Sequence, residues 1–202
     1  MLSNKGSNSF VEKITNRDTL KEYISSTFPI SSGLERSFIR NVLKSMDLQR
    51  LQDYFYGFWM RRDKADPEHA WLLYNEQVKK VQYNFGTRIK KGYQTDRGRV
   101  YLEYGPPNTR VQQYFDPNNY PYEIWQYYTL KENQRNRKFV FYSPDMVTSD
   151  FFLLHSDAIG ENNNPSWQID LQGRSYAPLD LQDTQSIHSW GGLPSDYWDL
   201  PN

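Results

Sequence analysis

Hydrophobic residues in the first part of the chain recur at three- and four-residue steps, the spacing of an amphipathic helix. The pattern predicts a short helix over residues 15–25, with Thr15 as its N-cap. Its apolar side consists of Leu20, Tyr23 and Ile24. Ser31 or Ser32 can cap a second helix. The predicted buried face of that helix consists of Leu34, Phe38, Val42 and Met46.

Two longer helices are predicted next. Asp47 can cap the third, whose apolar stripe consists of Leu48, Leu51, Phe55, Phe58 and Trp59. The fourth begins with Asp66 as N-cap and Pro67 at the first helical position, where a missing N–H costs nothing. Its predicted buried face is Trp71, Tyr74, Val78, Val81 and Phe85. We expect it to end at Gly92, in a left-handed conformation after two lysines.

After Gly92 the hydrophobic period changes from about 3.6 to 2. Alternation over residues 100–104 predicts a strand, which the turn sequence "GPPN" ends. Further strands are predicted over residues 110–115, 122–130, 138–143 and 150–156. No helix-length segment separates them, so we expect an antiparallel meander. The predicted class is α+β, with the N-terminal helices packed on one face of a mainly antiparallel sheet.

The predicted organisation is one domain between two irregular ends. Residues 1–10 are rich in Ser, Asn and Gly and are expected to be disordered. Residues 11–91 form the helical half and residues 92–160 the sheet half. Residues 161–202 read as an irregular tail, and we expect it to dock partly on the domain through some of its tryptophans, Trp167, Trp190 and Trp198.

Composition narrows the possible functions. The 202 residues include 24 basic and 24 acidic side chains, so the charge that attracts nucleic acid is missing, and we expect no nucleic-acid partner. Burial relies on rings, because the chain has 6 Trp, 16 Tyr and 11 Phe. Cysteine is absent, which excludes disulfides, thiolate catalysis and cysteine-bound zinc. No apolar run is long enough to span a membrane. The first ten residues also lack the apolar core of a signal peptide.

The segment "GYQTDRGRVYLEYGPPN", residues 92–108, resembles the defining segment of the GWxTD domain family. Gly92, Thr95 and Asp96 match the name, and Tyr93 stands where the family has Trp. "FWMRRDKADP", "YNEQ", "YEIWQY" and "FFLLHSDAIGENNNPSW" resemble neighbouring family segments, so the resemblance covers roughly residues 50–170. It implies a domain of larger exported bacterial proteins, often lipoproteins, without an established biochemical function. We therefore expect the periplasm or cell envelope as its location, a targeting segment outside this chain, and a protein or glycan partner there.

The cluster "TDRGR" allows two interpretations. Arg97 and Arg99 can present forked donors to a carboxylate, a phosphate or sugar hydroxyls, oriented by Thr95 and Asp96. Alternatively, Thr95 or Asp96 accepts backbone N–H groups in a turn, and the arginines pair with structural acids. Residue types alone leave both open.

Other candidate groups fit structural roles better than catalytic ones. His155 is followed by Ser156 and Asp157, but neighbours on a strand point to opposite faces and no nucleophile elbow is present, so we expect a structural histidine. The acids and His69 in "RRDKADPEH" lack the spacing of calcium or zinc ligands, so no metal site is expected. Glu103 and Glu123 are either paired carboxylates across a cleft or outward strand residues bound to arginines.

The aromatic strand "YEIWQYY" places Tyr122 and Ile124 on one side and Trp125 and Tyr127 on the other. One side should be core, and the other is either covered by helices or the tail, or exposes rings for binding. The leading hypothesis is a binding or assembly module without catalytic residues, cofactor or metal. Its candidate binding residues are Tyr93, Thr95, Asp96, Arg97, Arg99, Trp125 and His155. The alternative is an envelope hydrolase or glycan-binding module with a cleft near Asp96, Arg97, Arg99 and Glu103. The oligomeric state is not predicted.

Overall fold

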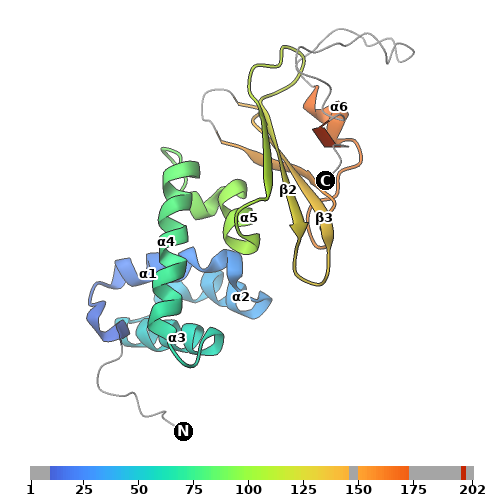
Figure 1. Ribbon diagram of the computed structural model, residues 1–202. Coiled ribbons are helices and arrows are strands. Elements are labelled where there is room, and N and C mark those ends of the chain that lie inside the picture. Colours follow the sequence, from blue (N-terminus) through green and yellow to red (C-terminus); the bar gives the residue numbers. More distant parts are fainter. Residues whose placement is uncertain (1–9, 146–149, 173–196, 199–202) are drawn as a thin grey trace. The chain divides into compact units, whose positions relative to one another are not determined.

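A computed structural model describes residues 10–145, 150–172 and 197–198 (Figure 1). The chain divides into two compact units, Met1–Asn84 and Phe85–Asn202. The segment predicted to be disordered lies outside the described residues except for Phe10, which is buried. Trp190 of the predicted tail lies outside them as well. None of the helices within the described ranges has both the length and the apolarity needed to cross a membrane.

The first unit is helical. Short 3₁₀ turns lie before and between its first helices, at Phe10–Lys13 (η1), Phe28–Ile30 (η2) and Leu43–Ser45 (η3). The α-helices are α1 (Arg17–Ser26), α2 (Gly33–Asn41), α3 (Leu48–Arg62) and α4 (Pro67–Phe85), whose last residue belongs to the second unit.

Side-chain caps fix where these helices begin. Ser32 forms a capping box with Glu35 at the start of α2, and Asp47 Oδ1 accepts the Arg50 N–H at the start of α3. The His69 N–H donates to Asp66 Oδ1 before α4, so these three predicted caps are confirmed. The prediction of Thr15 was wrong, because Asn16 Oδ1 accepts the N–H groups of residues 18 and 19 and caps α1.

Rings dominate the core of the first unit. Phe55 contacts Trp71 edge-on at 4.9 Å between ring centroids, and Trp59 lies 5.6 Å from the same tryptophan. The predicted buried face of the second helix was wrong for Leu34, which is 87% exposed, and for Val42, which is also exposed, whereas Phe38 and Met46 pack against the core. The helix ends at Asn41, so the chain turns earlier than the pattern implied. The fully buried residues of this region are Ile39 and Leu43, which the pattern did not indicate.

The second unit contains a four-stranded antiparallel sheet in the order β1-β2-β3-β4. The strands are β1 (Thr109–Gln113), β2 (Tyr122–Thr129), β3 (Arg135–Tyr142) and β4 (Phe152–Ser156). A 3₁₀ turn, η4 (Gly92–Gln94), leads into helix α5 (Asp96–Tyr104), and a short helix, α6 (Trp167–Leu171), follows the sheet. The predicted α+β class and the antiparallel meander are confirmed.

Two predictions around the start of this unit were wrong. Residues 100–104 form the end of helix α5, whereas the alternation had predicted a strand. Helix α4 ends at Phe85, and the left-handed glycine that follows a helix is Gly105, with φ 88°, after α5. A period of two over five residues is too short to exclude a helix.

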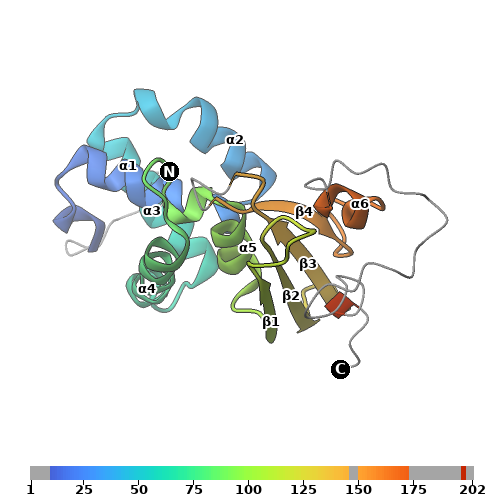
Figure 2. The same ribbon diagram turned by 90° about the horizontal axis from the view of Figure 1, so that it is seen from above.

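Both faces of the sheet are covered within the second unit (Figure 2). On the α5 side, Trp125 lies 5.5 Å from the Phe85 ring, and Tyr104 of the helix lies 5.4 Å from Phe139. On the other side, Tyr122, Ile124, Val140 and Leu154 form a core with Trp167 and Leu171 of α6. The side of Trp125 and Tyr127 is therefore core as well.

Candidate functional site

The beginning of α5 is held by two side chains of the sequence-predicted site. Thr95 Oγ1 accepts the Gly98 N–H at 3.1 Å as the N-cap, and its hydroxyl donates to the Gly92 carbonyl at 2.8 Å. Asp96 Oδ2 accepts the backbone N–H of Leu153 on β4 at 2.8 Å. Asp96 therefore joins the first turn of the helix to the edge of the sheet.

A single buried carboxylate lies at the centre of the α5 side of the sheet. The side chain of Glu123 is 0% exposed. Its Oε1 accepts hydrogen bonds from Arg97 at 2.8 Å, Arg110 at 2.8 Å and the Tyr114 hydroxyl at 2.5 Å. Its Oε2 accepts from Arg110 Nε at 3.0 Å and from the indole of Trp125 at 2.8 Å. Both oxygens are thus saturated by donors.

These donors decide the charge state of the cluster. Burial by itself raises the pKa of Glu123, but hydrogen bonds from Arg110 and Tyr114 and the charge of Arg97 hold it below its ordinary value. Burial, together with the hydrogen bond to this carboxylate, raises the pKa of Tyr114 to about 12. Glu123 is therefore an anion that accepts hydrogen bonds, and it is not poised to exchange a proton near neutral pH.

The guanidinium of Arg97 lies close to two aromatic rings. The residue is 8% exposed, and its guanidinium lies 4.0 Å from the ring centroid of Phe151 and 5.2 Å from that of Phe85. A buried guanidinium requires a partner anion, which Glu123 supplies. Arg97 thus anchors α5 to the middle of the sheet.

Arg99 faces a different acid. Its guanidinium forms a bidentate pair with Glu161, at 2.8 and 2.7 Å, and a longer contact with Glu103 at 3.2 Å. The Tyr104 hydroxyl donates to Glu161 Oε1 at 2.8 Å. These bonds tie α5 to the segment that follows β4.

That segment covers the outer edge of β4. The Ser156 N–H donates to the Asn162 carbonyl at 2.8 Å, and the Asn162 amide donates to the Leu154 carbonyl at 3.1 Å. Asp96 takes the N–H of Leu153 on the same strand. Within the described ranges, by contrast, the backbone of β1 pairs with β2 and with no other segment. Among the described residues, therefore, the β4 edge of the sheet is covered and the β1 edge is not.

His155 lies on the opposite side of the sheet from Glu123. Its Nδ1 accepts the Asn164 N–H at 3.0 Å, which leaves the proton of the neutral ring on Nε2. Its ring is stacked at 13° to Trp167, with 6.0 Å between centroids. Burial lowers the pKa of His155 below its ordinary value. Neither Ser156 nor Asp157 is recorded as a hydrogen-bond partner of the His155 ring, so the geometry is not that of a triad.

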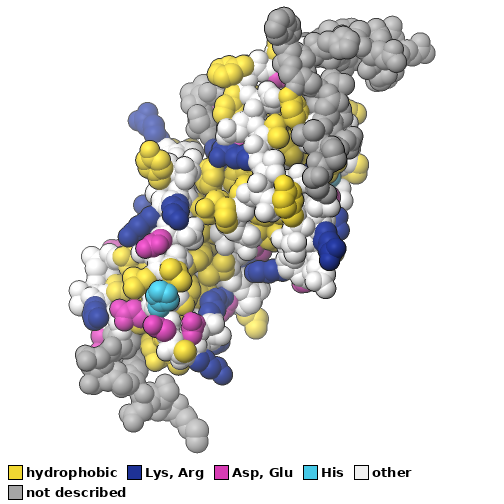
Figure 3. All heavy atoms as spheres, viewed as in Figure 1, with side chains coloured by type: hydrophobic (Ala, Val, Ile, Leu, Met, Phe, Trp, Pro, Cys, Tyr) yellow, Lys and Arg dark blue, Asp and Glu magenta, His cyan; other side chains and the backbone are white. Residues whose placement is uncertain are grey.

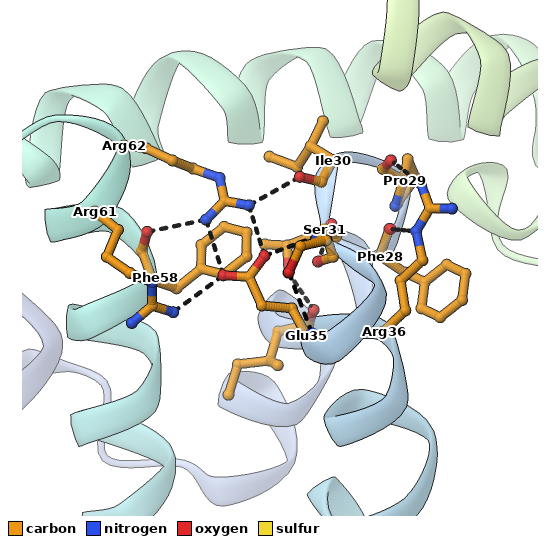
Figure 4. Close-up of polar contacts among 12 residues, drawn as sticks. Phe28, Pro29, Ile30, Ser31, Glu35, Arg36, Phe58, Arg61 and Arg62 are labelled. Carbon is orange, nitrogen blue, oxygen red and sulfur yellow. Dashed lines mark hydrogen bonds and ion pairs between the residues drawn. The ribbon is translucent and has the colours of Figure 1, made fainter. Parts of the chain in front are cut away.

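The first unit contains a second carboxylate with two arginines (Figure 4). Glu35 accepts from Arg62 on both oxygens, at 3.3 and 3.0 Å, and from Arg61 at 3.0 Å. Arg62 also donates to the Ile30 and Phe58 carbonyls. Burial raises the pKa of Glu35, but the hydrogen bonds from Arg62, Ser32 and Arg61 bring it down to about 2. This cluster joins α2 to the end of α3.

A family model for the GWxTD domain matches residues 8–168, well over half of the chain. The chain belongs to the GWxTD domain family. Comparison with curated proteins and with solved structures found no match.

In this GWxTD domain, the segment that matches the family name is a structural junction. Gly92 supplies a carbonyl to the Thr95 hydroxyl, Tyr93 is buried in η4, and Thr95 and Asp96 hold the start of α5. These bonds correspond to the second interpretation of the cluster, with backbone N–H groups on the oxygens and acids on the arginines.

The predicted site residues of the GWxTD domain do not form one site. Arg97 and Trp125 meet at Glu123, Arg99 points to Glu161, and His155 lies on the other face. Sequence reasoning missed Arg110, Tyr114 and Glu161. The alternation along β1 places Arg110 and Tyr114 on one side and could have indicated their common partner. Across the described ranges, His, Asp and Glu side chains form no group of three suited to a metal.

Proposed function

We propose that this GWxTD domain is a non-catalytic binding and assembly module of a bacterial cell-envelope protein, and that it binds a protein partner by strand addition at β1. The observation that carries the proposal is the difference between the two edges of the sheet. Strand addition needs outward backbone N–H and C=O groups without partners, and β1 is the edge that offers them among the described residues.

Exposed rings near β1 support a protein partner. Phe115, two residues after the strand, is 95% exposed, and Tyr114 and Tyr128 are also exposed. Hydrophobic side chains reach the surface on the face of the second unit shown in Figure 3. Aromatic side chains beside an open strand can add apolar contact to the main-chain hydrogen bonds that a partner strand would form.

The alternative of an envelope hydrolase or glycan-binding cleft has less support. Asp96, Arg97 and Arg99 are each engaged by a backbone or side-chain partner. Glu123 is a buried, saturated anion, which does not suit an acid that must donate a proton during glycoside cleavage. The location in the periplasm or cell envelope follows from the family resemblance and forms part of the proposal.

Site-specific photocrosslinking tests this function. A benzophenone amino acid replaces Phe115 in the full chain, and Ile159, which is 66% exposed in the segment after β4, serves as the matched control position. In extract from the native cell envelope, we expect one discrete protein adduct at position 115 and none at 159. A Thr109→Lys variant places a charge on the exposed edge and should reduce the adduct. Equal labelling at both positions, or adducts with glycans alone, would contradict the proposal.

A further inference from the structure

The face of the sheet opposite α5 carries contacts that strand addition does not explain. Trp198 lies 5.4 Å from the Trp167 ring and 5.0 Å from the His155 ring, between centroids. Tyr197 and Trp198 pack against the core formed by Tyr122, Ile124, Val140, Leu154, Trp167 and Leu171. Two residues from near the end of the chain therefore cover the side of the sheet that α6 also covers.

Polar groups fix the position of this pair. Gln113 Nε2 on β1 donates to the Tyr197 hydroxyl at 2.8 Å. Lys138 Nζ on β3 donates to the carbonyl of Trp198, and its ammonium lies 5.6 Å from the centroid of the Trp198 ring. With His155 on β4, three strands each contribute one side chain to a two-residue segment.

The contact has the features of a ligand site. Among the described residues, the side chains of Gln113 and Lys138 donate to the pair, and Tyr197 and Trp198 stay partly exposed. The surface beneath them is a buried core formed by other residues. An aromatic anchor that fills an apolar surface, oriented by a few polar groups, is the usual basis of peptide recognition.

We propose that this face is a binding site for a peptide segment with adjacent Tyr and Trp, which the chain's own Tyr197–Trp198 occupies in the structure. The same segment presented by another molecule can replace it. The indole fills the space beside Trp167 and His155, the phenol hydroxyl accepts from Gln113, and the backbone carbonyl accepts from Lys138. The site uses a face of the sheet, so it is independent of strand addition at the edge.

A labelled peptide with the sequence of residues 195–200, SDYWDL, tests the proposal by fluorescence anisotropy. The acceptors are the full chain and its Tyr197→Ala/Trp198→Ala double variant. We expect saturable binding to the double variant and binding at least about tenfold weaker to the unaltered chain, because the tethered pair competes. A peptide with both aromatics replaced by alanine should not bind. Adding Lys138→Ala to the double variant should weaken binding several-fold, whereas Ile169→Ala, an exposed position on α6, should leave it unchanged.

Three results would overturn the proposal. One is the absence of saturable binding to a double variant that unfolds cooperatively, and another is equal binding to both proteins. The third is a double variant that fails to fold, because Tyr197 and Trp198 would then be part of an obligatory core and not a separable ligand. Labelling with 5-fluorotryptophan gives a second measurement on the unaltered chain. The fluorine resonance of Trp198 is identified by its absence from the Trp198→Ala variant. Excess peptide should shift this resonance. An unmoved resonance at saturating peptide would show that the peptide does not replace Trp198.

Discussion

Glu35 in the first unit and Glu123 in the second are both carboxylates that hold two arginines, but their surroundings differ. The Glu35 side chain is 14% exposed, and its partner Arg61 is 58% exposed. The Glu123 side chain is 0% exposed, and the side chain of its partner Arg97 is 9% exposed. Arg62 also donates to two backbone carbonyls, and Arg97 donates to Glu123.

The comparison shows that the same charge pairing has different consequences at different depths. Near the surface, water can replace a lost partner, so the net contribution of an ion pair is small. In the interior, removing one member leaves a charge without compensation, and the cost is that of desolvating it. The two clusters should therefore respond very differently to equivalent substitutions.

The largest effect is expected for Glu123→Ala. The substitution leaves Arg97 and Arg110 facing each other without their anion and removes the acceptor of Trp125, so we expect a loss of about 3–5 kcal/mol in the free energy of unfolding. Urea unfolding followed by near-ultraviolet circular dichroism measures it. Glu103→Ala, which removes a partly exposed acid of the same unit, should cost less than about 1 kcal/mol. Equal losses of unfolding free energy in the two variants would contradict the idea that burial sets the cost of removing a carboxylate.

An intermediate case is the pair of Arg99 with Glu161, whose side chains are 26% and 8% exposed. Arg99→Ala should cost about 1.5–3 kcal/mol, because a bidentate charged contact is lost at partial burial. It should also speed hydrogen exchange at the amides of β4, since the covering segment is released from α5. If exchange speeds up equally in β1, the covering segment does not protect the edge.

A smaller effect is expected for Glu35→Gln. The amide keeps one acceptor oxygen for Arg62 and removes the negative charge, and both arginines can turn to water, so the loss should be about 1–2 kcal/mol. Glu76→Gln, an exposed change on α4, provides the matched control with a change below about 0.5 kcal/mol. A loss as large as that of the same Glu→Gln change at Glu123 would show that exposure does not set the cost.

The smallest expected effect is on the pH dependence of the free energy of unfolding, which reports the ionisation of Glu35. The pKa of Glu35 falls from 4.5 to about 2 in the folded chain, so its stabilisation is present above pH 4.5 and is lost as the pH falls through that interval. In the interval the unfolded chain binds more protons, and stability therefore rises with pH. The Glu35→Gln variant should show a shallower dependence between pH 2 and 4.5 in urea titrations. An unchanged slope would mean that Glu35 titrates normally.

Sequence patterns predicted the elements whose signals are local. Asp66 and Pro67 fix the start of α4, and the apolar run of β2 with its flanking turns was sufficient for a strand. Helix α5 was missed because residues 100–104 fit both periods, and Gly98 weakens a helical signal. Thr95, interpreted as part of a turn, is the N-cap that would have decided the case.

The charge clusters could be predicted only in part. Pairing of Glu123 with arginine was one of the two interpretations, but its complete burial was not, because burial depends on the placement of α5 on the sheet. Arg97 reaches Glu123 from 26 positions away in the sequence, and local periodicity carries no information on such contacts. The contact of Asn162 with the edge of β4 also depends on how the chain folds back, so local periodicity could not predict it.

The hydrogen bond that the Leu153 N–H donates to Asp96 bears on how many molecules can join through the sheet. A sheet that can be extended at both of its edge strands can propagate from molecule to molecule into a fibre. In this unit, Asp96 and Asn162 occupy backbone groups of β4, so a sheet could be extended through β1 and not through β4. Two copies joined through β1 would each present a covered β4 at the other edge, so such an assembly would stop at two.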